Sequence, residues 1–142
     1  MDHLERFITR LEATKAEGII RKFDELGRIV IPVEFRIGKL KEGYTNVKVF
    51  TLNDYAIIEV LDEEENKNLK QVDELGRVVI NKAIRESLNW NYGDSIEIWN
   101  FDKFYILKKA EPKCVFCGSK QNLSKYKGKL ICQQCGIEIK ER

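Results

Sequence analysis

The residues best suited to chemistry are the four cysteines, which form two pairs of identical spacing. Two residues separate the members of each pair and 14 residues lie between the pairs, which are Cys114 with Cys117 and Cys132 with Cys135. A two-residue spacing lets one tight turn direct both sulfurs at a single point, and four thiolates satisfy the tetrahedral coordination of Zn²⁺. The pattern predicts one structural zinc ion, because four thiolates leave no open position for activating water.

Other uses of these cysteines stay open at this level. Two disulfides, an iron–sulfur cluster or a redox dithiol would also account for paired cysteines. The segment at 111–142 has few large apolar side chains, so metal binding is expected to supply much of its folding free energy. We therefore expect zinc as the cofactor, held in a small C-terminal module.

A five-residue motif occurs twice along the chain. The run Asp-Glu-Leu-Gly-Arg occupies residues 24–28 and again residues 73–77, 49 residues later. At the same offset, residues 29–31 align with 78–80 and Arg36 aligns with Arg85. A unit of about 45 residues buries too little apolar surface to be stable alone, so two copies are expected to share one core.

The elements that must position these residues follow from the same alignment. In the first copy, β-branched and aromatic runs at 19–23 and 29–31 predict a hairpin-like pair of strands that turns at Gly27. A helical turn after Pro32 and a second strand pair at 47–52 and 55–61 follow. The second copy predicts a short helix at 82–88 and a second strand pair at 95–101 and 104–108.

Residues 21–36 resemble the motif of the AbrB/SpoVT/MazE family of swapped-hairpin DNA-binding domains, and the resemblance covers about residues 18–110. The second copy also carries the family-like helix end and loop at 88–94. The resemblance implies a mainly β (α+β) fold in which two units interleave their hairpins into one barrel. Tandem copies then imply that one chain forms the barrel as a pseudo-dimer.

The family binds DNA through basic residues on its first hairpin and adjoining turn. Carried over to this chain, that role falls on seven side chains: Arg21, Lys22, Arg28, Arg36, Lys70, Arg77 and Arg85. Arginine offers a planar fork to guanine edges or phosphates, whereas lysine mainly supplies charge. The copies differ, since Pro32 becomes Asn81, Lys22 becomes Gln71 and the Leu-x-x-x-x-Gly-Asp signature occurs only in the second copy. Unequal DNA contacts, or one copy that does not bind, are both compatible with these differences.

Each group of cations also has an alternative interpretation in which its side chains do not contact DNA. In both loops, aspartate and arginine could pair across the turn and only shape it. For Arg21, Lys22 and Lys70 the alternative is a solvated strand face.

The two ends of the chain predict separate elements. Leu4, Phe7, Ile8 and Leu11 recur at helical spacing within residues 2–16, which predicts an amphipathic helix that packs on the barrel or contacts a partner. Near the other end, the cysteine segment resembles the treble-clef zinc modules of ClpX-type unfoldases, which implies a helix at about 133–140, whereas a zinc ribbon would place a strand there.

Charge and composition narrow the function. The net charge of +2 conceals a gradient of −4 over residues 1–66, +2 over 67–110 and +4 over 111–142. A single histidine and the absence of a nucleophile–base pattern argue against an enzyme. A polar, acidic N-terminus without a long apolar run predicts a cytoplasmic protein without membrane contact.

These observations predict four segments: a helix at 1–17, AbrB-like repeats at 18–66 and 67–110, and a four-cysteine zinc finger at 111–142. The expected function is a transcriptional regulator that binds double-stranded DNA, with a homo-oligomer or protein partner contacted through the N-terminal helix or zinc module. The alternative is a protein-interaction module such as a MazE-like antitoxin or an adaptor.

Overall fold

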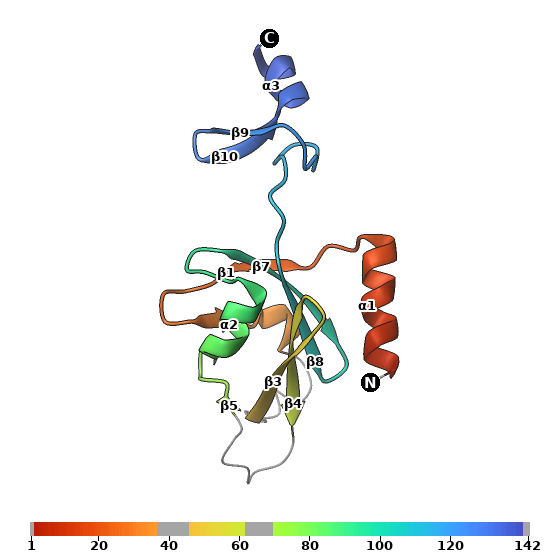
Figure 1. Ribbon diagram of the computed structural model, residues 1–142, viewed down its shortest axis with the longest axis vertical. Coiled ribbons are helices and arrows are strands. Elements are labelled where there is room, and N and C mark those ends of the chain that lie inside the picture. Colours follow the sequence, from red (N-terminus) through yellow and green to blue (C-terminus); the bar gives the residue numbers. More distant parts are fainter. Residues whose placement is uncertain (1, 37–45, 62–69, 141–142) are drawn as a thin grey trace. The chain divides into compact units, whose positions relative to one another are not determined.

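The computed structural model of this 142-residue chain describes residues 2–36, 46–61 and 70–140 (Figure 1). The chain divides into two compact units, Met1–Ala110 and Glu111–Arg142. The first unit carries both copies of the loop motif and the second carries all four cysteines. The acidic run at 62–65 and the polar residues that follow it predict a solvated linker or turn at 62–68, and this segment lies outside the described residues. None of the helices in the described ranges is long and apolar enough to cross a membrane.

A six-stranded antiparallel sheet forms the centre of the first unit, in the order β1-β7-β8-β4-β3-β5. Its strands are β1 (Ile19–Lys22), β3 (Asn46–Leu52), β4 (Tyr55–Leu61), β5 (Lys70–Gln71), β7 (Ser95–Phe101) and β8 (Phe104–Lys109). The hairpins β3–β4 and β7–β8 turn at Asn53 and Asp102, whose φ values of 55° and 54° suit short polar side chains. The mainly β class and both of these strand pairs agree with the prediction.

The strands of one copy pair with those of the other. Strand β1 pairs with β7 and β5 pairs with β3, while β2 (Arg28–Val30) and β6 (Arg77–Val79) form a separate two-stranded ribbon. The predicted hairpin of strands 19–23 and 29–31 is therefore wrong in its pairing. The turn itself is tight, since the backbone N–H of Asp24 donates to the Arg28 carbonyl at 3.0 Å, but the strands on either side of it complete ladders with the other copy. A lone two-stranded hairpin is marginal, and this exchange buries far more apolar surface.

The main core lies on one face of the sheet and draws on both copies. Its members are mostly β-branched residues that are shielded from solvent, which suits the pleated surfaces of strands. They are Phe23, Ile29, Ile31, Val47, Ala56, Ile58, Val60, Val72, Val78, Ile80, Trp90, Ile96, Ile98, Tyr105 and Leu107. Since neither copy closes this core by itself, the two repeats fold as one unit.

Helix α1 (Asp2–Thr14) covers the opposite face of the sheet. Its buried residues Leu4 and Ile8 contact a second cluster that contains Ile57 and Ile106, and Phe7 stacks on Phe101 with ring centroids 4.5 Å apart. The predicted hydrophobic stripe thus packs on the sheet. The helix ends earlier than expected, at Thr14 instead of 16, because the backbone turns left-handed at Lys15 (φ 53°).

The two copies differ in the helix that follows the ribbon. In the first copy, a single 3₁₀ turn (η1, Val33–Phe35) follows Pro32. In the second, α2 (Lys82–Leu88) is a longer α-helix whose N-cap, Asn81, accepts a hydrogen bond from the Ile84 N–H at 2.9 Å. Asparagine can cap a helix in this way and proline cannot, so the Pro32/Asn81 difference has a structural consequence.

The second unit is a hairpin followed by a helix. Strands β9 (Leu123–Tyr126) and β10 (Lys129–Cys132) pair across a turn at Lys127 and Gly128, and α3 (Gln133–Lys140) follows directly. The helix lies where the resemblance to treble-clef modules implied one, at about 133–140, and the residues at 123–126 and 129–131, with Lys127 and Gly128 between them, fit a hairpin from their sequence as well.

Candidate metal centre and nucleic-acid interface

The four cysteine sulfurs converge on one point of the second unit. All four Sγ atoms lie within 4.8 Å of one another, and the Cys117 and Cys132 sulfurs are 3.5 Å apart. A tetrahedron with Zn–S bonds of about 2.3 Å has sulfurs about 3.8 Å apart. The observed spacings bracket that value, so the donor set and its dimensions fit a single tetrahedral ion.

Backbone geometry holds the sulfurs in place. The first pair lies in a turn in which the Gly118 N–H donates to the Cys114 carbonyl at 3.0 Å, and Gly118 adopts φ 78°. The second pair lies where β10 ends and α3 begins, with the Cys135 N–H directed at the Cys132 sulfur at 3.5 Å. A turn and a strand-to-helix junction therefore present one pair of ligands each.

The thiols influence one another strongly. Burial acts to raise the pKa of Cys114, but hydrogen bonds from backbone N–H groups, including that of Phe116, outweigh it and lower the pKa to about 6. The pKa of Cys135 is raised, first through its hydrogen bond to Cys132 and then through burial. Sulfurs this close share protons in the absence of a cation, and a divalent ion would replace those protons.

Asp24 shapes the first arginine loop. Its Oδ1 accepts hydrogen bonds from the backbone N–H groups of Leu26 (3.0 Å) and Arg28 (2.7 Å), and its Oδ2 accepts one from the Arg28 Nε at 2.7 Å. Burial acts to raise the pKa of Asp24, but these hydrogen bonds and the positive charge of Arg28 outweigh it and lower the pKa.

The second loop repeats this geometry. The Asp73 carboxylate accepts hydrogen bonds from the N–H groups of Leu75 (3.0 Å) and Arg77 (2.9 Å), and from the Arg77 Nε at 2.5 Å. The backbone N–H of Arg77 is the main reason that the pKa of Asp73 is lowered. The loop-shaping pair that the sequence allowed is thus present in both copies.

The other two predicted arginines lie against the loop of the opposite copy. A Cβ atom added to Gly27 would stand 3.0 Å from the guanidinium carbon of Arg85, and one added to Gly76 would stand 2.8 Å from that of Arg36. The Nε atoms of both arginines are buried without a hydrogen-bond partner among the described atoms. Each loop is therefore completed by an arginine from the other repeat.

Backbone hydrogen bonds reinforce this crossing. The Gly27 carbonyl accepts from the Ile80 N–H, and the Gly76 carbonyl accepts from the Ile31 N–H, both at 2.8 Å. Sequence reasoning selected the arginines but missed the glycines as the surfaces that receive them. The only available signal was that both residue types recur at the same offset, and this does not reveal that the contacts cross between copies.

The remaining predicted cations lie on the first strand of each copy. Arg21 is half-buried on β1 and its Nη1 donates to the Ile20 carbonyl at 2.9 Å, while Lys22 is exposed. Lys70 is half-buried on β5, and its pKa is lowered by burial and then by the positive charge of Arg85. Lys70 and Arg85 are thus close enough for the charge of Arg85 to lower the pKa of Lys70.

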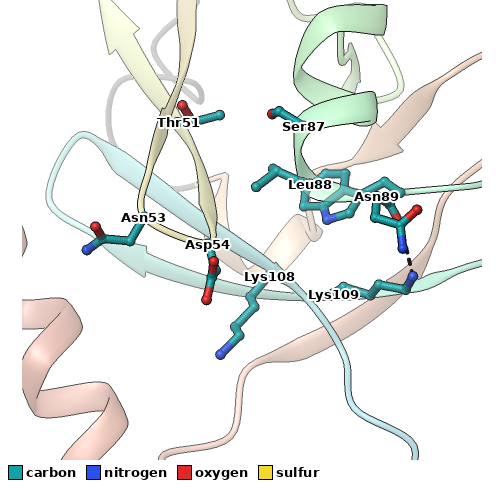
Figure 2. Close-up of a pocket in the computed structure, with 9 residues that line it drawn as sticks. Thr51, Asn53, Asp54, Ser87, Leu88, Asn89, Lys108 and Lys109 are labelled. Carbon is teal, nitrogen blue, oxygen red and sulfur yellow. Dashed lines mark hydrogen bonds between the residues drawn. The ribbon is translucent and has the colours of Figure 1, made fainter.

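A separate pocket of about 390 Å³ lies between the β3–β4 turn and the end of α2 (Figure 2). Two lysines line it, but the Lys109 ammonium donates to the Asn89 carbonyl at 2.9 Å and pairs with Asp94 at 3.2 Å. The Lys108 ammonium lies 5.3 Å from the centre of the Tyr55 ring. Both cations are therefore already engaged, and none of the predicted site residues lines this pocket.

The fold and these contacts define a class: a mainly β protein with two equivalent arginine-bearing loops, each completed by the opposite repeat. No family model matches the chain, and no solved structure matches it significantly. The transition state regulatory protein AbrB of Bacillus subtilis (strain 168) is 40% identical to it over 74 residues, which cover 49% of this chain and 77% of AbrB. The chain belongs to the AbrB family.

Proposed function

We propose that the protein is a transcriptional regulator that binds double-stranded DNA through the two arginine loops. The observation that carries this proposal is the crossing of Arg36 and Arg85, which gathers the cations of two distant segments at each loop. One site consists of the loop at 24–28 with Arg85 and Lys70. The other consists of the loop at 73–77 with Arg36. Membership of the AbrB family, whose relative is named a regulatory protein, supports the same conclusion.

The chemistry of these side chains suits DNA. Each Asp–Arg pair fixes an arginine through its Nε, and the terminal nitrogens of a guanidinium are the atoms that bind guanine edges or phosphates in pairs. Each phosphate that the cations neutralise adds a salt-dependent increment to the affinity through counterion release.

We propose further that the two tandem repeats form a swapped-hairpin barrel that acts as a pseudo-dimer. The reciprocal strand pairs β1–β7 and β5–β3, and the ribbon β2–β6, support this assignment. The arrangement presents two related sites, which suits a pair of DNA half-sites. The halves are unequal, because Gln71 stands where the first copy has Lys22.

The cysteine cluster is proposed to hold one structural zinc ion in a treble-clef module. The convergence of four sulfurs and the start of α3 between Cys132 and Cys135 support this. Zinc would supply cross-linking and folding free energy and no catalysis. The module also carries exposed lysines and the exposed Val115 and Phe116, so a contact with DNA or with a protein partner is assigned to it. We retain the four segments predicted from the sequence as the proposed organisation, with no membrane contact and no enzymatic role.

Titration with labelled genomic duplex fragments tests the main proposal. The wild-type protein should bind at low salt, and affinity should fall steeply as salt rises. Arg77→Glu, which reverses a charge of the second loop, should weaken binding at least tenfold. Lys48→Glu, which reverses an exposed charge on β3 outside both loops, is the matched control and should change it little. Absence of binding at about 50 mM salt, or equal loss in both variants, would refute the proposal.

A further inference from the structure

The ribbon of β2 and β6 has an outward face that mixes two arginines with two valines. Arg28 lies directly opposite Val79, and Val30 lies directly opposite Arg77. The central pair, Ile29 with Val78, alternates to the other face and is fully buried in the core. The outward face is therefore a square with arginines on one diagonal and valines on the other.

Neither valine can bind a phosphate, and both reach the outward face of the ribbon, Val30 half-buried and Val79 more exposed. Val79 is 46% exposed. It lies at the end of a three-residue strand whose central residue, Val78, is fully buried. A phosphate gains nothing from an aliphatic side chain, and water is an unfavourable environment for one. An apolar group of a DNA base, in contrast, would remove this surface from water.

In the major groove, that group is the thymine methyl. The groove is about 12 Å wide and admits a two-stranded ribbon, whose strands lie about 4.8 Å apart. Bidentate arginine to guanine and apolar contact with the thymine methyl are both established means of base readout. The ribbon carries both kinds of side chain on one face, and the Asp24 and Asp73 carboxylates hold its arginines at opposite ends.

We propose that Val79 and Val30 are specificity residues that contact thymine methyl groups in the major groove, between bases contacted by Arg28 and Arg77. This inference rests on the proposed DNA-binding function and deepens it. The inference predicts a DNA target of mixed sequence, in which thymines lie beside guanines. The bases would be contacted by a two-stranded ribbon, whereas many regulators contact them with a helix.

Uracil substitution supplies the test, because uracil lacks only the methyl group. A duplex selected from a random library by the wild-type protein is synthesised again with deoxyuridine in place of thymidine. Burial of one or two methyl groups predicts a loss of affinity of roughly three- to tenfold for the wild-type protein. In Val79→Ala and Val30→Ala, the thymine form should bind more weakly and the difference between the two duplexes should shrink toward one. Ile137→Ala, which truncates an exposed isoleucine of α3 outside the ribbon, should keep the full wild-type difference.

The outcomes separate the two proposals. Binding of the wild-type protein with equal affinity for both duplexes would overturn the methyl readout and leave the DNA-binding function standing. A loss on uracil substitution that is the same in the wild-type protein and in folded Val79→Ala would overturn it too, because the loss would then come from DNA stiffness. Failure to select any duplex would overturn the proposed function itself. Val79→Thr, which keeps the shape of the side chain, supplies a second test should the alanine variant unfold.

Discussion

The guanidinium of Arg85 lies against Gly27, and the equivalent Arg36 lies against Gly76. The φ values of the two glycines are 77° and 79°, a left-handed conformation that other residues rarely adopt. Both constraints, backbone conformation and lack of space, thus meet at the same residue. Each loop depends on the other repeat for its conformation. A mutation that distorts one repeat is therefore expected to alter the loop of the other repeat as well.

Gly27→Ala should destabilise the protein by about 1–3 kcal/mol, from the strained φ together with displacement of Arg85. Chemical denaturation followed by intrinsic fluorescence measures this change. Gly93→Ala is the matched control, because Gly93 has φ 87° but no atom within 4 Å of an added Cβ. The control should show only the conformational part, about 1 kcal/mol.

A double-mutant cycle isolates the contact itself. If Arg85 lies against Gly27, the cost of Gly27→Ala should be smaller in an Arg85→Ala background than in the wild-type protein. Strictly additive free energies of unfolding would show that the two residues do not interact.

Asp24→Asn separates loop shaping from DNA contact. An asparagine side chain can still accept the backbone hydrogen bonds of Leu26 and Arg28, so stability should fall by less than about 1 kcal/mol. The arginine remains and a negative charge is lost, so DNA affinity should stay the same or rise. Arg28→Ala should instead lower affinity tenfold or more. Equal stability losses with unchanged affinity in both variants would leave Arg28 with a structural role only.

Tyr105 predicts a loss of stability at high pH. Burial raises the pKa of its hydroxyl to about 12, against a small opposing effect of Arg36, and this hydroxyl donates to the Phe35 carbonyl at 2.7 Å. The folded state therefore keeps a proton that the unfolded chain loses near pH 10. Stability is fully present below about pH 10 and falls between about pH 10 and 12 by about 2–3 kcal/mol.

Tyr105→Phe should remove that part of the pH dependence and cost about 1 kcal/mol at neutral pH, since the Phe35 carbonyl loses its donor. Tyr55, whose pKa burial also raises, will leave some of the slope in place. Tyr92→Phe, at a side chain that is 72% exposed, should behave like the wild-type protein. Unfolding curves from about pH 8 to 12 measure all three, and an unchanged slope in Tyr105→Phe would contradict the assignment.

Removal of zinc should unfold the second unit and spare the first. Chelation, or Cys132→Ser, is expected to make the segment at 111–142 sensitive to protease, while Met1–Ala110 keeps its structure because its core contains none of the cysteines. Ser124→Ala, on an exposed position of β9, is the control and should keep one zinc per chain. Metal analysis of the purified protein that finds no zinc, or a second unit indifferent to chelation, would contradict the metal assignment.

The sequence predicted the positions of the helices and strands better than it predicted which strands pair with each other. Both later strand pairs and the hairpin at 123–132 follow from local patterns of β-branched residues and turn residues, and the resemblance to treble-clef modules implied the helix Gln133–Lys140. The pairing of β1 with β7 could not be obtained in this way, because the strand at 19–22 has the same alternation whichever neighbour it joins. Ladder formation is decided by the shared core, which local sequence does not encode.

The same distinction between local patterns and long-range contacts applies to the candidate site. The clustering of the four cysteines depends on their local spacing and was predictable, as were the pairs of Asp24 with Arg28 and Asp73 with Arg77, which lie four residues apart. The contacts of Arg36 and Arg85 with the opposite loops are long-range, and they are visible only once the two repeats are folded together.

The salt dependence of DNA binding is the most direct test of the central claim. Affinity should fall steeply with salt in the wild-type protein, and at each salt concentration it should be about a hundredfold lower in Arg28→Ala/Arg77→Ala, since each lost arginine–base contact costs about 1–3 kcal/mol. Thermal unfolding of the variant would verify that it is folded. A folded variant with the affinity of the wild-type protein, or a wild-type protein that binds no duplex at low salt, would contradict the account.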